Sequence, residues 1–76
     1  MKEVLKTIIS NLVDNEEAVE INQIDSEKSI TFEVKVADSD MGKVIGKQGK
    51  IAKAIRTVMK SLAAKEHKKV IIEFVD

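Results

Sequence analysis

Apolar residues recur at helical spacing in two parts of the chain. In the first part the apolar positions are Val4, Leu5, Ile8, Ile9 and Leu12. Polar residues lie between them, and the pattern predicts an amphipathic helix over about residues 2–13. In the second half the apolar positions are Ile51, Ile55, Val58, Met59 and Leu62. With the alanines between them, they predict a longer helix over about residues 50–65.

A different pattern, in which every second residue is apolar, marks three candidate strands. The cleanest covers residues 30–36, where Ile, Phe and Val alternate with polar residues, as in a strand with one buried face. Residues 18–24 alternate less regularly, and residues 69–75 form a closing strand. Because the polar segment 25–28 predicts a turn, the first two strands should form an antiparallel hairpin.

Between the second and third strands we expect two helices joined by a loop. Ser39 is the expected N-cap of a short helix from Asp40 to Ile45, because a serine side chain can accept a bond from a free amide group there. Gly46 to Gly49 interrupts this helix before the longer one begins. The order predicts a single α+β domain over residues 1–76, with helices on one face of a three-stranded sheet. The helical crossover lets the last two strands run parallel, which makes the sheet mixed.

The composition excludes several classes of function. The chain has no cysteine and one histidine, so disulfides, thiolate metal sites and a Cys–His pair are unavailable. No apolar run approaches the ~18 residues of a membrane span, and the first residues lack the apolar region of a signal peptide. We therefore expect a cytoplasmic protein that is not an enzyme and that has no cofactor, no metal and no membrane contact.

The net charge is zero, but the charges are segregated along the chain. Residues 1–40 carry four lysines and ten acids, a net charge of −6, whereas residues 41–76 carry nine bases and three acids, a net charge of +6. No acid occurs between Met41 and Lys65. Such segregation favours one surface that meets a polyanion, although a lysine-rich helix can also be only a solvated face.

The most informative motif is Val-Ile-Gly-Lys-Gln-Gly-Lys, residues 44–50, directly before the longer helix. Glycines lack a Cβ atom and let a backbone approach closely, and the amide groups at a helix start attract anions. The spacing excludes a nucleotide-binding P-loop of the form G-x-x-x-x-G-K-[ST], because Gln48 follows Lys47 where Ser or Thr is required. A Gly-x-x-Gly loop alone is a weak motif, and its basic flanks make a nucleic-acid backbone the favoured ligand.

With this loop between its two middle helices, the chain resembles a type II KH domain, the bacterial variant, and the small single-KH RNA-binding proteins of the KhpA type. Residues 40–56 carry most of the resemblance, and the remainder fits by element order and length. The resemblance implies sequence-tolerant binding of single-stranded RNA, and possible binding of single-stranded DNA, by a loop that clamps the backbone. It also implies RNA chaperoning and post-transcriptional regulation, with links to cell shape and cell-wall homeostasis.

The residues expected to bind RNA surround this loop. They are Lys43, Val44, Ile45, Gly46, Lys47, Gln48, Gly49, Lys50, Lys53 and Arg56. Lys47 and Gln48 offer one charge and one amide at the loop tip, and the other bases extend the positive surface. Val44 and Ile45, with Ile55, are expected to form an apolar groove for bases.

Two further features of the chain bear on how it would read bases. Both aromatic residues, Phe32 and Phe74, fall at core positions of strands, so stacking should be weak and sequence selectivity low. The chain also departs from the usual KH pattern at Ala52, where a bulky aliphatic residue is common and Ile51 stands beside it. This departure points to a helix that is rotated or more closely packed.

A second hypothesis, from a different class, is a protein-interaction adaptor that binds RNA only together with a partner. The helix 50–65 has apolar residues around most of its circumference, and a chain of this length can cover only part of them. Val58, Met59 and Leu62 are therefore the candidate interface. The resemblance implies a homodimer, or a heterodimer with a larger Jag/KhpB-type RNA-binding protein, and two linked sites would strengthen weak binding.

Overall fold

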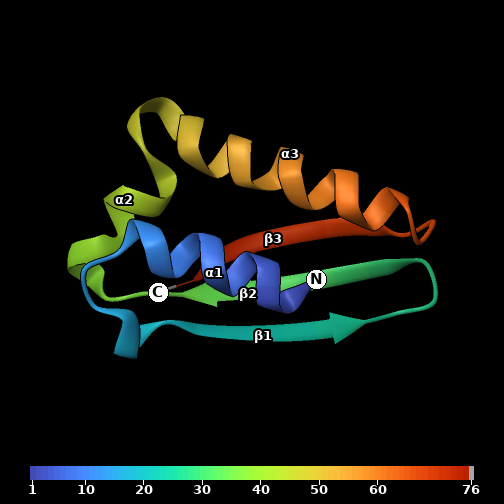
Figure 1. The fold of residues 1–76 in the computed structure, drawn as a ribbon, viewed down its shortest axis with the longest axis horizontal. Coiled ribbons are helices and arrows are strands. Elements are labelled where there is room, and N and C mark those ends of the chain that lie inside the picture. Colours follow the sequence, from blue (N-terminus) through green and yellow to red (C-terminus); the bar gives the residue numbers. More distant parts are fainter. Residues whose placement is uncertain (76) are drawn as a thin grey trace.

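The computed structural model describes residues 1–75, which form helices and strands in the predicted order (Figure 1). The helices are α1 (Lys2–Leu12), α2 (Met41–Ile45) and α3 (Lys50–Ala64), and the strands are β1 (Glu20–Asp25), β2 (Ser29–Lys35) and β3 (Lys69–Val75). Short 3-10 turns occur at η1 (Glu16–Ala18), η2 (Asp38–Asp40) and η3 (Lys47–Gly49). Each predicted helix and strand is present, with boundaries shifted by one or two residues at several ends.

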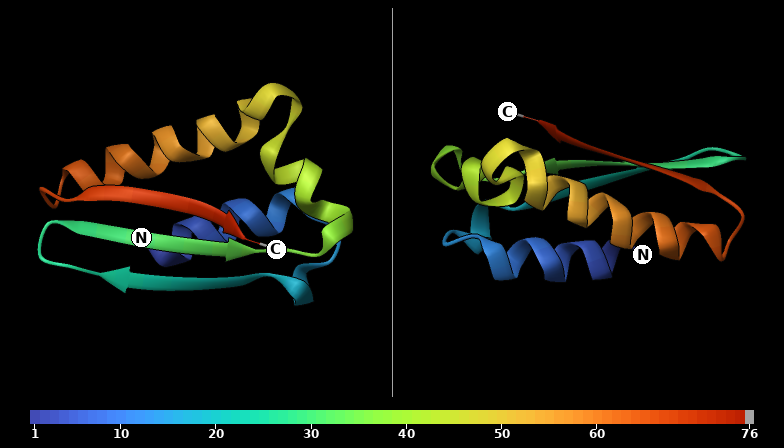
Figure 2. Two further views of the ribbon diagram at one scale, coloured as in Figure 1. Left: turned by 180° about the vertical axis from the view of Figure 1, so that it is seen from behind. Right: turned by 90° about the horizontal axis from the view of Figure 1, so that it is seen from above.

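The sheet has the mixed topology that the sequence predicts. Strand β2 lies in the centre, antiparallel to β1 and parallel to β3. Residues 36–68, with α2 and α3, form the crossover that allows β2 and β3 to run in the same direction. Both α1 and α3 cover one face of the sheet, as Figure 2 shows from above and from behind. The α+β architecture with helices on one face is therefore confirmed.

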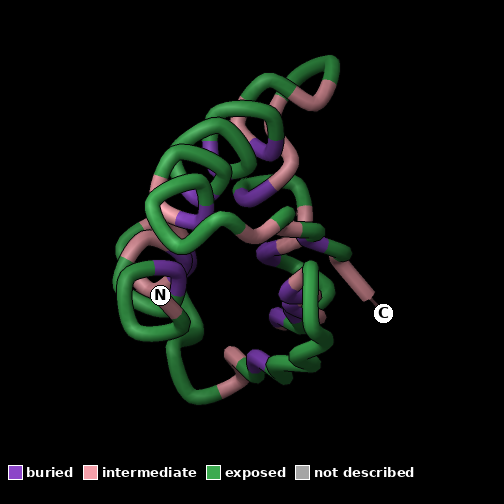
Figure 3. Tube along the Cα trace, turned by 90° about the vertical axis from the view of Figure 1, so that its right-hand side faces the viewer, coloured by how far each residue is buried: buried purple, intermediate pink, exposed green. Residues whose placement is uncertain are grey.

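The hydrophobic core fills the space between the helix layer and the sheet. Helix α1 contributes Leu5 and Ile9, the central strand contributes Phe32 and Val34, and α3 contributes Met59, all fully buried. Figure 3 shows the buried positions on the sides of the helices and strands that face one another. Burial of such side chains stabilises the fold by about 1.5–3 kcal/mol each, so this layer holds α1 and α3 in place.

The opposite face of the sheet carries no helix within residues 1–75, as expected. The side chains of β2 and β3 on this face are all exposed or half-buried: Thr31, Glu33, Lys35, Lys69, Ile71, Glu73 and Val75. Ile24 and Ile71 are paired with Thr31 from either side, so two exposed isoleucines flank a threonine on a mostly polar face. An antiparallel hairpin with one polar face commonly contacts solvent in this way.

The expected cap of α2 is wrong. Ser39 lies inside the turn η2, and Asp40 occupies the N-cap position of α2 without a side-chain capping bond. The carboxylate of Asp40 instead accepts hydrogen bonds from the backbone amides of Asp14 and Asn15, which follow α1. The tertiary contact therefore takes precedence over the local capping that the sequence suggested.

Candidate nucleic-acid interface

The loop between α2 and α3 is held in a backbone conformation that requires glycine. Gly46 has φ 75° and ψ 175°, a region that is essentially restricted to glycine. Gly49 is left-handed with φ 72°, and Gln48 is also left-handed with φ 57°. The amide of Gly46 donates to the carbonyl of Gly42 at 2.9 Å, and the amide of Gly49 donates to the carbonyl of Gly46 at 3.3 Å. These bonds close a tight turn at one end of the molecule (Figure 1).

The two glycines differ in what surrounds them. A Cβ atom added to Gly46 would lie 2.6 Å from Cγ1 of Ile51, closer than side-chain atoms approach one another. A Cβ atom added to Gly49 would meet no atom within 4 Å. Gly46 is thus packed against the start of α3, whereas Gly49 faces open space in which another molecule can reach the backbone.

The start of α3 offers a positive site beside this open space. Gly49 is the N-cap, and no side chain caps the 15-residue helix. The amide of its first residue, Lys50, donates to the carbonyl of Lys47, and the amides of the first turn have no side-chain acceptor. These amides form the positive end of the helix dipole. The side chains of Lys47, Gln48 and Lys50 are exposed around them. The arrangement combines backbone donors, a helix dipole and free bases, which together suit a phosphate group.

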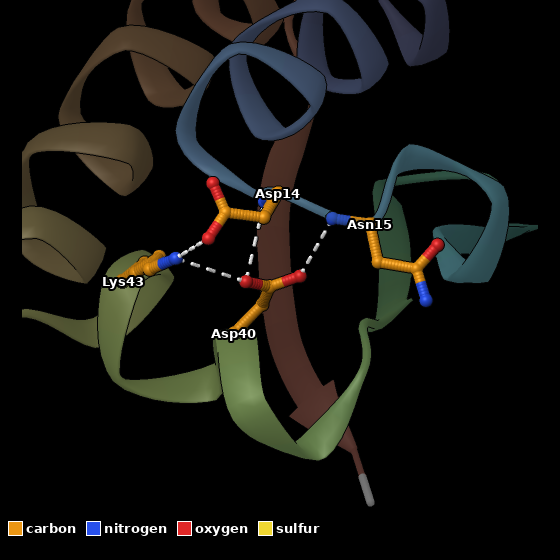
Figure 4. A network of polar contacts seen from close by, with 4 residues as sticks. All are labelled: Asp14, Asn15, Asp40 and Lys43. Carbon is orange, nitrogen blue, oxygen red and sulfur yellow. Dashed lines mark hydrogen bonds and ion pairs between the residues drawn. The ribbon is translucent and has the colours of Figure 1, made fainter.

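Lys43 is placed differently from the other predicted bases. Its ammonium group lies 3.3 Å from the carboxylate of Asp40 and also bonds the carboxylate of Asp14 (Figure 4). The bond to Asp14, followed by the bond to Asp40, raises the pKa of Lys43 above its usual value. Within residues 1–75 the ion pairs of this structure all involve Lys43. The positive charge of Lys43 is therefore paired with two carboxylates of the protein, although its side chain remains partly exposed.

A hollow lies along α3, between this helix and the free edge of β3. It has a volume of about 270 Å³ and is lined by Arg56, Lys60, Lys69, Val70, Ile71 and Ile72. The guanidinium of Arg56 donates to the carbonyl of Ile72 at 3.1 Å and lies 5.6 Å from the centre of the Phe74 ring. These contacts fix Arg56 at the edge of the sheet.

Lys60 and Lys69 were not among the predicted site residues, yet they line the hollow with Arg56. The spacing of Arg56 and Lys60 by four residues places them on one side of α3, which is a signal the sequence contains. Phe74 lies only partly buried under Arg56 rather than deep in the core. The basic surface thus extends from the loop to β3.

The apolar groove predicted for bases is not formed as expected. Val44 is fully buried and Ile55 nearly so, and both belong to the core, while Ile45 is half-buried against it. Ala52 is buried and Ile51 lies against Gly46, so the departure from the usual pattern lets α3 approach the loop closely. Val44 and Ile45 therefore belong to the core and do not line an open groove.

The apolar groove that the structure does contain lies between α1 and α3. It has a volume of about 390 Å³ and is lined by Ile8, Leu12, Lys50, Ile51, Ala54, Ile55 and Val58. Val58 is 47% exposed and Leu62 is half-buried. Met59 is 0% exposed and faces the core, which corrects its assignment to a candidate interface.

Comparison with known proteins decides the family. A family model described as KhpA/KhpB, KH domain, matches residues 2–74. The chain belongs to the KhpA/KhpB family of KH domains. Family membership confirms the resemblance drawn from the glycine loop and agrees with a protein that is not an enzyme, since KH domains are nucleic-acid-binding modules.

Relatives in this KhpA/KhpB family are similar over nearly their whole length. A protein named RNA-binding protein KhpA from Caldanaerobacter subterraneus subsp. tengcongensis is 59% identical over 75 residues, which cover 99% of this chain and 100% of the relative. Proteins of the same name are 55% identical in Clostridium acetobutylicum, over 99% of this chain and 100% of the relative, and 45% identical in Borreliella burgdorferi, over 97% and 90%. No solved structure was found to match the chain.

Membrane-spanning helices and metal-binding clusters are both absent among the described residues. Within residues 1–75, no helix is both long enough and apolar enough to cross a membrane. In the same range, no group of three or more His, Asp or Glu side chains is placed to hold a metal ion.

Proposed function

We propose that this protein binds single-stranded RNA with the Gly46–Gly49 loop, whose backbone receives the phosphodiester chain. The observation that carries the proposal is the open space over Gly49 at the uncapped start of α3. The relatives named RNA-binding protein KhpA support RNA as the ligand. Lys47, Gln48 and Lys50 supply two charges and one amide around the backbone donors.

From the loop, the RNA strand follows the basic side of α3. Lys53 and Arg56 lie one and two turns further along the helix, and the hollow lined by Arg56, Lys60 and Lys69 comes next. Bases enter this hollow at the free edge of β3, which offers backbone groups and apolar side chains. A few phosphate contacts and no exposed stacking platform give weak, sequence-tolerant and salt-sensitive binding.

A protein of this kind suits RNA chaperoning and post-transcriptional regulation in the cytoplasm, with effects on cell shape and cell-wall homeostasis. Chaperoning requires release as well as capture. A site that holds about four nucleotides by their backbone, without stacking aromatics, releases its strand readily. Low selectivity also lets one protein act on many transcripts. Single-stranded DNA should compete with RNA only if contacts to the 2′-hydroxyl contribute nothing to the affinity.

The decisive experiment is fluorescence polarisation with a labelled single-stranded RNA of mixed sequence at two salt concentrations. The wild type is compared with a loop variant, Lys47→Asp with Gln48→Asp, and with a control, Lys6→Asp with Asn11→Asp on the exposed side of α1. Both variants exchange one lysine and one amide for acids, so their net charges are equal.

We expect salt-weakened binding by the wild type and the control, and no measurable binding by the loop variant. Equal losses in the two variants would mean that only net charge matters and that the loop is not the site. If the isolated wild-type protein binds no RNA, this proposal fails, and RNA binding would depend on a second chain.

A second function, association with another protein, is supported by the groove between α1 and α3. Its lining is almost entirely apolar, and Val58 is 47% exposed. Within the part of the chain that the structure describes, few other large apolar residues are exposed. A second copy of the chain, or a larger KhpB-type partner, would cover Val58 and Leu62. Such pairing joins two weak RNA sites and raises the combined affinity.

A further inference from the structure

Asp40 is a buried carboxylate that serves two distant segments at once. Its side chain is 1% exposed, and within residues 1–75 it is the only polar or charged residue that is buried. One carboxylate oxygen accepts from the amide of Asp14 at 3.2 Å, and the other accepts from the amide of Asn15 at 3.0 Å. The ammonium of Lys43 lies 3.3 Å from the first oxygen (Figure 4).

The contact joins the end of α1 to the start of α2. Helix α1 ends at Leu12, and the two amides that Asp40 accepts belong to the connection that leads to β1. Asp40 stands at the N-cap of α2, about 25 residues later in the chain. A buried carboxylate is tolerated only when its oxygens are bonded, so the geometry of both segments is set together.

Helix α2 needs this support because it has only five residues. A helix of one or two turns is not stable without tertiary contacts. Val44 anchors α2 in the core, and Met41 and Ile45 pack against the same core. The carboxylate of Asp40 adds the polar contact that ties the start of α2 to the end of α1. The residue after α2 is Gly46, so any rotation of α2 moves the loop.

We infer that Asp40 is a positioning residue for nucleic-acid binding, which holds α2 and thereby presents the Gly46–Gly49 loop to the phosphodiester backbone. Lys43 belongs to the same tether and is not a phosphate contact. The inference rests on the proposed RNA binding at this loop. Asp40, the only buried charged residue among residues 1–75, thus acts on the binding site without touching the RNA.

Electrostatics alone makes the opposite prediction, which gives a sharp test. Removing a negative charge from a protein that binds a polyanion should tighten binding. Asp38 provides the matched control, since it lies in the same turn η2, carries the same charge and is exposed. The variants Asp40→Asn and Asp38→Asn therefore change charge equally and differ in whether they break the tether.

The experiment measures RNA affinity by fluorescence polarisation at low temperature, where circular dichroism shows each variant to be folded. We expect Asp38→Asn to bind as tightly as the wild type or tighter. We expect Asp40→Asn to bind about fivefold more weakly, as when the loop is in its competent arrangement about a fifth of the time. Amide NMR signals of Gly46 and Gly49 should shift or broaden in Asp40→Asn only, a change that a uniform loss of stability would not produce.

A second variant keeps the inference testable if Asp40→Asn does not fold. Lys43→Met removes the tether's cation, and its side chain is 44% exposed. We expect weaker binding with an unchanged dependence on salt, whereas Lys47→Met should lower the log–log salt slope by about 0.7. A fall of that size in Lys43→Met would make Lys43 a phosphate contact and overturn the tether.

Failure of the inference can be told apart from failure of the proposed function. If the wild type binds RNA and Asp40→Asn binds equally well or tighter, with unchanged loop signals, Asp40 has no positioning role and the RNA site stands. If the wild type binds no RNA, the site itself is wrong and the inference falls with it.

Discussion

Gly46 and Ile51 lie so close that no side chain fits between them, with an ideal Cβ atom at Gly46 only 2.6 Å from Cγ1 of Ile51. Gly49, three residues later, has no atom within 4 Å of the same position. The two glycines of one motif therefore have separate roles. Gly46 closes the loop against α3, and Gly49 leaves the backbone accessible.

Substitution of each glycine by alanine should separate these roles. Gly46→Ala adds a collision to a glycine-only conformation and should cost about 3 kcal/mol or more of the free energy of unfolding. Gly49→Ala should cost about 1–2 kcal/mol, because only the left-handed conformation opposes it. Urea unfolding measures both changes.

RNA binding should respond to Gly49→Ala beyond its effect on stability. The folded variant places a methyl group where a phosphate is proposed to lie, so its Kd should rise under conditions in which the protein remains folded. Wild-type affinity in folded Gly49→Ala would show that the RNA backbone does not approach this residue.

Among residues 1–75, two residues other than glycine, Gln48 and His67, adopt left-handed conformations, with φ 57° and 58°. His67 lies in the turn after α3 and forms a Schellman arrangement, because its amide donates to the carbonyl of Ala64 at 3.1 Å and the amide of Lys68 donates to the carbonyl of Ala63 at 3.1 Å. Glycine is the usual residue at such a position. Glycine at either site should therefore raise stability by up to about 1 kcal/mol, after its own entropic cost.

The two substitutions should differ in their effect on RNA. His67→Gly should leave the Kd unchanged, whereas Gln48→Gly removes the amide at the loop tip and should weaken binding severalfold while raising the melting temperature. A stabilising change that costs affinity would mean that strain at Gln48 is retained for function. Equal affinity in both variants would leave the Gln48 side chain without a role.

The helices and strands follow from the sequence because their patterns are local. Alternation along residues 69–75 predicts β3 to the residue, since each side chain faces the core or solvent by parity alone. The start of α3 at Lys50 follows from the glycine before it. The core face of α3 does not follow, because apolar residues lie around most of the helix.

Contacts between distant segments account for what the sequence did not reveal. Met59 and Val58 are neighbours of similar character, and only the position of the sheet decides that Met59 is buried and Val58 is not. In the sequence Asp40 is predicted only as the first residue of a short helix, and its acceptance of two amides from beyond α1 appears only in the fold. The placement of Arg56 beside Ile72 likewise depends on the crossover that returns β3 to β2.

Substitution of Val58 should therefore affect association, whereas substitution of Met59 should affect stability. Val58→Asp exposes a charge that solvent can reach, so stability should change by less than about 1 kcal/mol, while any association through the groove is lost. Met59→Ala empties a fully buried site and should cost about 2–5 kcal/mol. Light scattering and urea unfolding give the two readouts, and Thr57→Asp on the exposed side of α3 is the charge control. A wild type that stays monomeric at high micromolar concentration would exclude the homodimer.

Acid should release the tether at Asp40. The amide of Asn15, together with that of Asp14 and the ammonium of Lys43, holds the pKa of Asp40 below its ordinary value of 3.8. A carboxyl group with a lowered pKa in the folded state contributes stability above its unfolded pKa, and this contribution is lost as the pH falls through the folded pKa. The raised pKa of Lys43 has the opposite pH dependence. Its contribution to stability is fully present below about pH 10.5, the ordinary pKa of lysine, and is lost only as the pH rises above that value.

The stability difference between the wild type and Asp40→Asn should therefore be constant between about pH 5 and 9 and should shrink below about pH 4. Urea unfolding across this range measures the difference, with Asp38→Asn as the variant that should follow the wild type. A difference that stays constant down to about pH 2 would mean that the Asp40 carboxylate gains nothing from its bonds. Because the same bonds orient α2, loss of the difference should coincide with loss of the sharp amide signals of the Gly46–Gly49 loop.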